Sequence, residues 1–215
     1  PAPAPSSRIV LVGGGLGQRI QHDGQFETQL HLRYPERNLI VRNLCQPGDT
    51  AAYRPRAGRG DPWAFPGAEK LRPELRHHRG SGVEPSMDEW ITLCKPDIVI
   101  GFFGYNESFD GPAGLEAFRK ELEAWLRHTK ATKYGRDTPP AVALVSPLRF
   151  EPDPSIPGFP DGKTENENLA AYSKVMGEVA ASNDVGFIDL FAISRDAGRK
   201  LTSNGFLPDE DGFRY

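Results

Sequence analysis

Apolar residues gather in five short runs that are separated by amphipathic segments. The runs have the length of strands and span residues 8–12, 39–44, 98–103, 142–145 and 187–190. Between the third and fourth runs, Leu115, Phe118, Leu122 and Trp125 recur at intervals of three or four, which predicts a helix. A similar pattern over residues 169–179 predicts another. Because strands that alternate with helices form parallel sheets covered on both faces, we expect a three-layer α/β/α sandwich with about five parallel strands.

Two helix starts are indicated by the spacing of a capping box. Ser86 with Glu89, and Thr164 with Glu167, each place a glutamate three positions after a hydroxyl residue. Residues 46–85 have no clear period and are rich in Pro, Gly and Arg. A loop of that length inside a compact domain is usually functional or partly disordered.

The length and charge of the chain narrow the classes of function. At 215 residues it can bury one sizeable core, so we expect a linker at residues 1–7 and a single domain over residues 8–215. A net charge of −3 gives no support for binding to nucleic acid or to an anionic membrane. The apolar runs are far shorter than the roughly 20 residues of a membrane helix. We find no signal peptide, though one removed earlier would leave no trace, and the sequence leaves open whether the natural chain continues beyond Tyr215.

The cysteines and histidines give no indication of a metal site. Cys45 would end one strand and Cys94 precede another, about 20 Å apart in a parallel sheet, so we expect two free thiols. His77 and His78 are adjacent, without a further ligand at suitable spacing, and are typical of a solvated loop. The remaining histidines lie on predicted helices among polar residues, as expected of surface side chains: His22, His31 and His128. We therefore predict neither a metal nor a cofactor.

The stretch LVGGGLGQR, which follows the first apolar run, has the glycines of a binding loop. A dinucleotide site would need a third glycine at Gln18 and an acidic residue at the end of the second strand, which reads RNLC. A phosphate-binding P-loop would need a following GK[ST], which is absent. A plain turn, in which glycine supplies a positive φ and lets the helix pack close to the sheet, remains as an alternative to a modified catalytic site.

Four stretches resemble, in order, the sequence blocks of the SGNH (GDSL-like) hydrolases. LVGGGLGQR stands where that family has its Gly-Asp-Ser turn, RNLCQPGDT resembles the second block, IGFFGYNE the third and LTSNGFLPDEDGF the last. Through FFGYNESFDGPAGLEAF the chain is most similar to SGNH-like domains of large secreted bacterial multidomain proteins. The resemblance implies a flavodoxin-like SGNH-hydrolase fold and an extracytoplasmic location, periplasmic or secreted.

Aligned on these blocks, the chain departs from the family at most of its catalytic positions. Gly15 stands at the nucleophile, Leu207 at the general base and Asn204 at the carboxylate that orients it. Cys45 replaces an oxyanion-hole glycine, where its N–H would still donate while its side chain fills space meant for substrate. Asn106 alone is retained. Since losing the nucleophile or the base costs serine hydrolases roughly a factor of 10⁶, the resemblance implies a pseudoenzyme.

The same positions predict a binding site. Gly15, Cys45 and Asn106 follow strands one, two and three, whose carboxyl ends border one crevice in an open parallel sheet. Glu107 and Ser108 come next, where polar residues suit either a ligand or the anchoring of a loop. We expect a non-hydrolytic domain that binds a carbohydrate or an acidic ligand through Asn106, Gly15, Cys45 and Glu107, or contacts neighbouring domains.

Other interpretations remain open at this stage. An active ester or carbohydrate-ester hydrolase would need a displaced nucleophile, such as Cys45, Ser108 or Ser203. A purely structural domain is a third possibility. The segment AYRPRAGRG, followed by Trp63, forms either a cationic and aromatic rim over the crevice or a solvated basic loop; its relevant residues are Tyr53, Arg54, Arg56 and Arg59.

Overall fold

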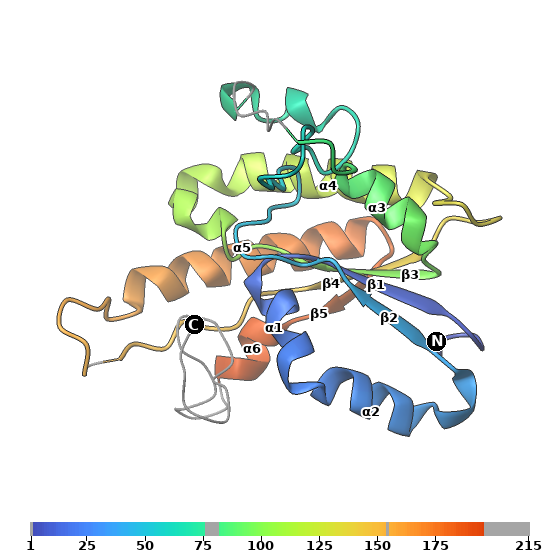
Figure 1. The fold of residues 1–215 in the computed structure, drawn as a ribbon. Helices are drawn as coiled ribbons and strands as arrows, with labels where there is room; N and C mark the ends of the chain where they lie inside the picture. Colours follow the sequence, from blue (N-terminus) through green and yellow to red (C-terminus); the bar gives the residue numbers. More distant parts are fainter. Residues whose placement is uncertain (1, 76–81, 154, 196–215) are drawn as a thin grey trace.

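A computed structural model describes residues 2–75, 82–153 and 155–195 of the chain (Figure 1). All five predicted strands are present and form one parallel sheet with the order β2-β1-β3-β4-β5. Their bounds are Arg8–Gly13 (β1), Ile40–Asn43 (β2), Ile98–Phe102 (β3), Ala141–Val145 (β4) and Gly186–Ile188 (β5). The strand order reverses direction between β1 and β3, which is where open sheets of this kind bind ligands at the carboxyl ends of the strands.

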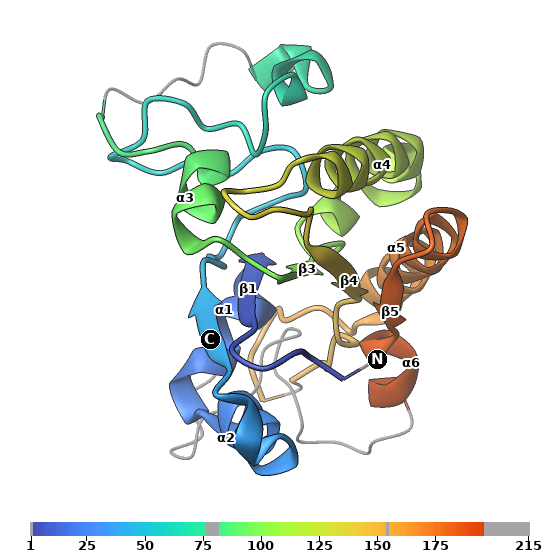
Figure 2. The same ribbon diagram turned by 90° about the vertical axis from the view of Figure 1, so that its right-hand side faces the viewer.

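Helices cover both faces of the sheet, so the predicted three-layer sandwich is confirmed (Figures 1 and 2). One face carries α3 (Met87–Cys94), α4 (Leu115–Ala131) and α5 (Lys163–Ser182), and the other carries α1 (Gly15–Asp23), α2 (Gln25–Arg33) and α6 (Leu190–Arg195). Successive strand side chains point to opposite faces, so β1 serves both cores. Val10 and Val12 pack with α4 and α5, whereas Ile9 and Leu11 pack with α1 and α2.

One of the two predicted capping boxes is present. The Glu89 N–H donates to Ser86 Oγ over 3.3 Å and the Ser86 N–H donates to Glu89 Oε2 over 2.7 Å at the start of α3. The prediction for Thr164 is wrong, because α5 begins one residue before it, after Gly162 in the left-handed conformation. There the carboxylate of Asp161 accepts the N–H of Lys163 instead.

Residues 46–75, which follow β2, pack over α3 and α4 (Figure 1). They contain two short 3₁₀ helices, η2 (Ala68–Lys70) and η3 (Pro73–Leu75), and a bridge that pairs Tyr53 with Trp63. Trp63 and Phe65 are buried against the α4 side of the core. Across the described residues, no helix is both long enough and apolar enough to span a bilayer.

Candidate functional site

The glycine turn after β1 lies directly against the end of β3. The Gly14 N–H donates to the carbonyl of Phe102 over 2.9 Å. Gly13 has a φ of +120°, and a Cβ atom there would overlap the Phe102 carbonyl. The turn therefore needs glycine for conformation and for close approach, as the plain-turn interpretation proposed, and Gly15 begins α1 with no side chain to offer.

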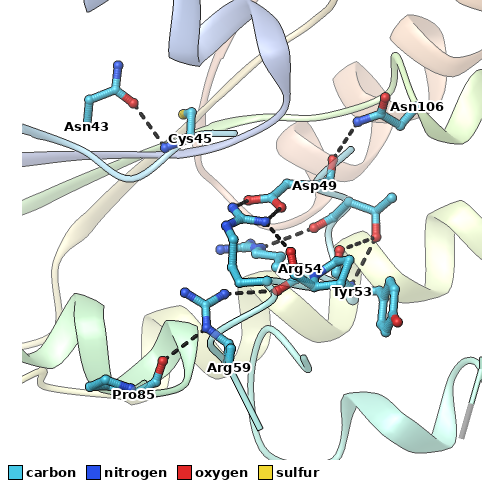
Figure 3. A network of polar contacts seen from close by, with 11 residues as sticks. Asn43, Cys45, Asp49, Tyr53, Arg54, Arg59, Pro85 and Asn106 are labelled. Atoms are coloured by element: carbon cyan, nitrogen blue, oxygen red, sulfur yellow. Dashed lines mark hydrogen bonds and ion pairs between the residues drawn. The ribbon is translucent and has the colours of Figure 1, made fainter. Parts of the chain in front are cut away.

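Asn106 lies beside this turn, so the predicted meeting of the ends of β1 and β3 occurs. Its Nδ2 donates to the carbonyl of Asp49 over 2.8 Å (Figure 3). A Cβ atom at Gly14 would come 3.2 Å from the same nitrogen. One amide hydrogen that would face a ligand in a catalytic site is thus used to hold the loop after β2.

The N–H of Cys45 does not point toward Asn106 and the glycine turn as a free donor, as the sequence suggests. Its N–H donates to Asn43 Oδ1 over 3.0 Å (Figure 3), so it is already engaged within its own turn. The buried Sγ packs against α1 at Gly17, and burial raises the pKa of the thiol well above its usual value. The N–H of Cys45 is therefore already used within the protein, and a contact between this residue and a ligand stays a prediction. The backbone of Asp49, which sequence reasoning missed, stands beside Asn106 in its place, preceded by the exposed Gly48 with a φ of +86°.

Glu107 is an anchor between loops. Its Oε1 accepts the N–H of Ala51 over 3.1 Å and its Oε2 accepts the N–H of Gly104 over 2.8 Å. Burial raises the pKa of this carboxyl group to about 7, although these hydrogen bonds oppose the rise. Ser108, also buried, donates to the carbonyl of Tyr105 over 2.7 Å. Of the two functions expected for this polar cluster, loop anchoring is the one these contacts support.

The crevice at the ends of β1, β3 and β4 is nearly closed. Gly14, Gly15, Phe102, Tyr105 and Ser146 are among the residues around a cavity of about 20 Å³. The buried Ser146 was missed by sequence reasoning. Its hydroxyl donates to Asp189 over 3.2 Å and accepts the N–H of Phe191 over 3.1 Å, which ties β4 to the start of α6.

Several predicted positions lie outside the described residues. These are the positions of the last sequence block and its neighbouring serine, Asn204, Leu207 and Ser203, and the paired histidines His77 and His78.

Arg54 is neither a rim residue nor a solvated one, so both interpretations of it are wrong. Its side chain is fully buried, with the guanidinium carbon 5.2 Å from the ring centre of Phe103 and 6.0 Å from that of Trp125. Its Nε donates to the carbonyl of Thr50 over 3.1 Å, and burial lowers the pKa of the group. Its guanidinium thus lies against two aromatic rings, whose faces attract a cation.

Arg56 and Arg59 are held by the protein and border an open cavity. Arg56 forms a two-pronged ion pair with Asp49, with both N–O distances 2.6 Å. Burial raises the pKa of Asp49, and the hydrogen bonds from Arg56 oppose this rise. Arg59 donates from Nε to the Pro85 carbonyl over 3.0 Å (Figure 3) and from Nη1 to the Arg54 carbonyl over 2.9 Å.

The cavity, called here the α1–α3 cavity, has a volume of about 510 Å³. It lies between α1, the segment that follows β2, and α3. Its polar and aromatic lining consists of Gln18, Gln21, Asn43, Gln46, Arg56, Arg59, Glu84 and Trp90. Cys45 also lines it, so this residue borders a cavity next to the predicted crevice.

The histidines are placed differently from one another. His22 and His31 are exposed on α1 and α2, as predicted. His128 is half-buried, which contradicts the surface prediction, because its Nε2 lies 2.8 Å from Asp88 Oδ1 and its ring stacks on Phe65 with centres 5.3 Å apart. Cys45 and Cys94 are both free thiols, as expected.

Comparisons with known proteins support the fold. No protein-family model matches the sequence, and no curated protein matches it. Among solved structures, the chain is similar to LAE5, an α/β hydrolase from the metagenome of Lake Arreo, with a TM-score of 0.61, 16% identity, and coverage of 98% of this chain and 91% of that one.

The chain is also similar to a catalytic mutant of Axe2, an acetylxylan esterase from Geobacillus stearothermophilus. The TM-score is 0.63 at 15% identity, with 99% of this chain and 91% of that one covered. Three catalytic mutants of that esterase replace an aspartate, a serine or a histidine. The chain thus has the five-stranded α/β fold of these hydrolases.

Proposed function

We propose that this chain is a non-hydrolytic, SGNH-like domain that works by binding a carbohydrate or an acidic ligand, or by contacting neighbouring domains of a larger exported protein. The observation that carries the proposal is the side-chain-free turn at Gly13–Gly15, packed onto β3 beside Asn106. In a serine hydrolase this strand end would have to present an attacking oxygen.

Three further observations support loss of hydrolysis. The crevice beside the turn has about 20 Å³, far less than the 300–1,000 Å³ of ordinary small-molecule sites. One hydrogen-bond donor that an oxyanion needs, the Asn106 amide, is directed at the Asp49 carbonyl. The aligned residues Asn204 and Leu207 also lack the acid–base chemistry of the family.

The competing candidate is a hydrolase with a displaced nucleophile. Ser146 is the observation in its favour, since this hydroxyl borders the crevice and contacts the carboxylate of Asp189. Against it, the oxygen is buried and already both donates and accepts a hydrogen bond. The buried thiol of Cys45 has a raised pKa, which disfavours the reactive thiolate.

Hydrolysis can be tested with a p-nitrophenyl acetate series and a fluorophosphonate probe on the full chain. We expect no turnover above buffer and no covalent labelling, because the described residues around the crevice offer no activated nucleophile. The Ser146→Ala variant is the control. Saturable labelling of the parent protein that disappears in this variant would establish the hydrolase instead.

A further inference from the structure

The α1–α3 cavity has a size that suits a ligand, as do two other hollows of about 450 and 700 Å³ in the described molecule, and it is the one that lies beside the carboxyl end of β2. At about 510 Å³ it is far larger than the crevice beside Asn106, and it opens between helices of two different layers. Small-molecule sites commonly have a volume of this order and a few well-placed polar groups. The chemistry of its walls therefore indicates what it would accept.

The charges around the cavity are balanced. Two arginines line it, but Arg56 is neutralised by the two-pronged contact with the buried Asp49. Arg59 shares the lining with Glu84, whose negative charge partly offsets it, and the backbones of the two residues pair in an isolated β-bridge. Two of the hydrogen-bonding nitrogens of Arg59 are also directed at carbonyl groups of the protein. A strong anion would meet no uncompensated pair of positive charges here.

The remaining polar groups are neutral amides. Gln18 and Gln21 project from α1, and Gln46 comes from the segment after β2. A primary amide both donates and accepts hydrogen bonds, as does the hydroxyl group of a sugar. A set of amides therefore suits a polyhydroxylated neutral ligand better than a carboxylate or a phosphate.

An aromatic side chain completes the wall on the α3 side. Trp90 lines the cavity and is 37% exposed, while the other two tryptophans, Trp63 and Trp125, are at most 8% exposed. The capping box at Ser86 fixes the start of α3 four residues before Trp90. An indole face exposed at the wall of a cavity can pack against the C–H face of a sugar ring.

The part of the rim that carries Arg59 and Glu84 is built by two loop backbones that cross at glycine. The Glu84 N–H donates to the carbonyl of Gly58 over 2.9 Å. A Cβ atom at Gly82 would overlap that same carbonyl, and one at Gly58 would overlap the side chain of Glu84. The close crossing fixes Glu84 and Arg59 in place at the edge of the cavity.

We infer that the α1–α3 cavity binds a neutral oligosaccharide, with a sugar ring on Trp90 and its hydroxyl groups on Gln18, Gln21 and Gln46. This inference rests on the proposed binding function and narrows it from carbohydrate or acid to uncharged sugar. It also moves the ligand from Asn106 to the neighbouring cavity.

The test titrates the full chain with xylotriose and cellotriose, and with trigalacturonate as an acidic sugar of matched length. Binding is followed by calorimetry and, in the parent protein, by quenching of tryptophan fluorescence, to which Trp90 is the most exposed contributor. We expect saturable binding of at least one neutral trisaccharide and little change between 20 and 300 mM salt, because no net charge is involved.

Variants locate the site. Trp90→Ala should weaken binding by about tenfold or more and Trp90→Phe by a few-fold at most, since phenylalanine keeps an aromatic face. Leu93→Ala is the matched control, because Leu93 is 62% exposed on the same helix and does not line the cavity. Circular dichroism of each variant confirms that it folds.

Three results would overturn the inference: tighter binding of trigalacturonate that weakens with salt, equal losses in Trp90→Ala and Leu93→Ala, or no saturable binding of either neutral sugar at 20 mM. The first leaves the broader proposal of a binding domain intact. Hydrolysis, measured separately with the ester series, is what would remove that proposal.

Discussion

Two buried acids hold the loop after β2 against the end of β3. The backbone carbonyl of Asp49 accepts a hydrogen bond from the Asn106 amide, and its carboxylate accepts hydrogen bonds from the Arg56 guanidinium. The carboxylate of Glu107 accepts the N–H groups of Ala51 and Gly104. The sequence predicts that these positions meet, because parallel strands share one carboxyl edge. It cannot predict which way each side chain turns, since that depends on loop backbone such as the Asn43 turn that engages Cys45.

Glu107 should make folding stability depend on pH. Its pKa rises from 4.5 to about 7 on folding. The contribution of this group to the free energy of unfolding is therefore fully present below pH 4.5 and is lost as pH rises through 7. At about 1.4 kcal/mol for each pH unit, this group should lower the free energy of unfolding by roughly 3 kcal/mol across that window. The Glu107→Gln variant loses one hydrogen bond at every pH, but it has no carboxyl group to titrate. Because only the parent protein loses stability as pH rises, the difference in the free energy of unfolding between the two should shrink between pH 5 and pH 8.

Urea denaturation at the two pH values measures this difference. Glu27→Gln, on the exposed side of α2, is the control and should follow the parent at both pH values. A Glu107→Gln deficit that is the same at pH 5 and pH 8 would show that the carboxyl group does not titrate in this window.

At the scale of elements, the sequence predicts which segments form strands and helices, but it does not determine the residue at which a helix begins. Both capping-box patterns look alike in the sequence, yet one caps α3 and the other lies inside the first turn of α5. The Asp161–Gly162 turn takes over there, because Gly162 adopts a left-handed conformation and Asp161 accepts the first N–H. When two neighbouring sequence patterns could each start a helix, the backbone conformation at that point determines which one does.

A pair of substitutions separates the two patterns. Ser86→Ala should lower the free energy of unfolding by about 1 kcal/mol, because it leaves the Glu89 N–H without its side-chain acceptor. Thr164→Ala should change it by less than about 0.5 kcal/mol, since this exposed residue does not cap α5. Chemical denaturation of both variants is the measurement, and equal losses would contradict the assignment of caps.

Across the whole molecule, the sheet joins two hydrophobic layers through alternate residues of the same strands. The apolar periodicity is sufficient to predict this arrangement, and the fold similarity to esterases agrees with it. The α1–α3 cavity was not predicted, because its walls come from α1, the irregular segment 46–59, Glu84 and α3. Nor was the burial of Arg54, whose flanking rings come from residues 49 and 71 positions away in the chain, Phe103 and Trp125.

The two layers should unfold as one unit. Leu11 and Val12 are adjacent on β1 and buried on opposite faces, at 1% and 0% exposure. Truncating either to alanine should cost about 2 kcal/mol or more, whereas Leu32→Ala, 69% exposed on α2, should cost less than about 0.5 kcal/mol. Tryptophan fluorescence, which reports the α3–α5 layer, and far-UV circular dichroism should shift together even for Leu11→Ala. Separate transitions would show that the layers unfold independently.

The backbone crossing of Gly58 and Gly82 leaves no room for a β-carbon at Gly82, although the chain around it has no regular secondary structure. The position of Arg59 and Glu84 at the edge of the α1–α3 cavity therefore depends on a residue that has no side chain. Among proteins that share this fold, we therefore expect those that keep the cavity to have the smallest amino acid at the position of Gly82, whatever residues they use to contact a ligand.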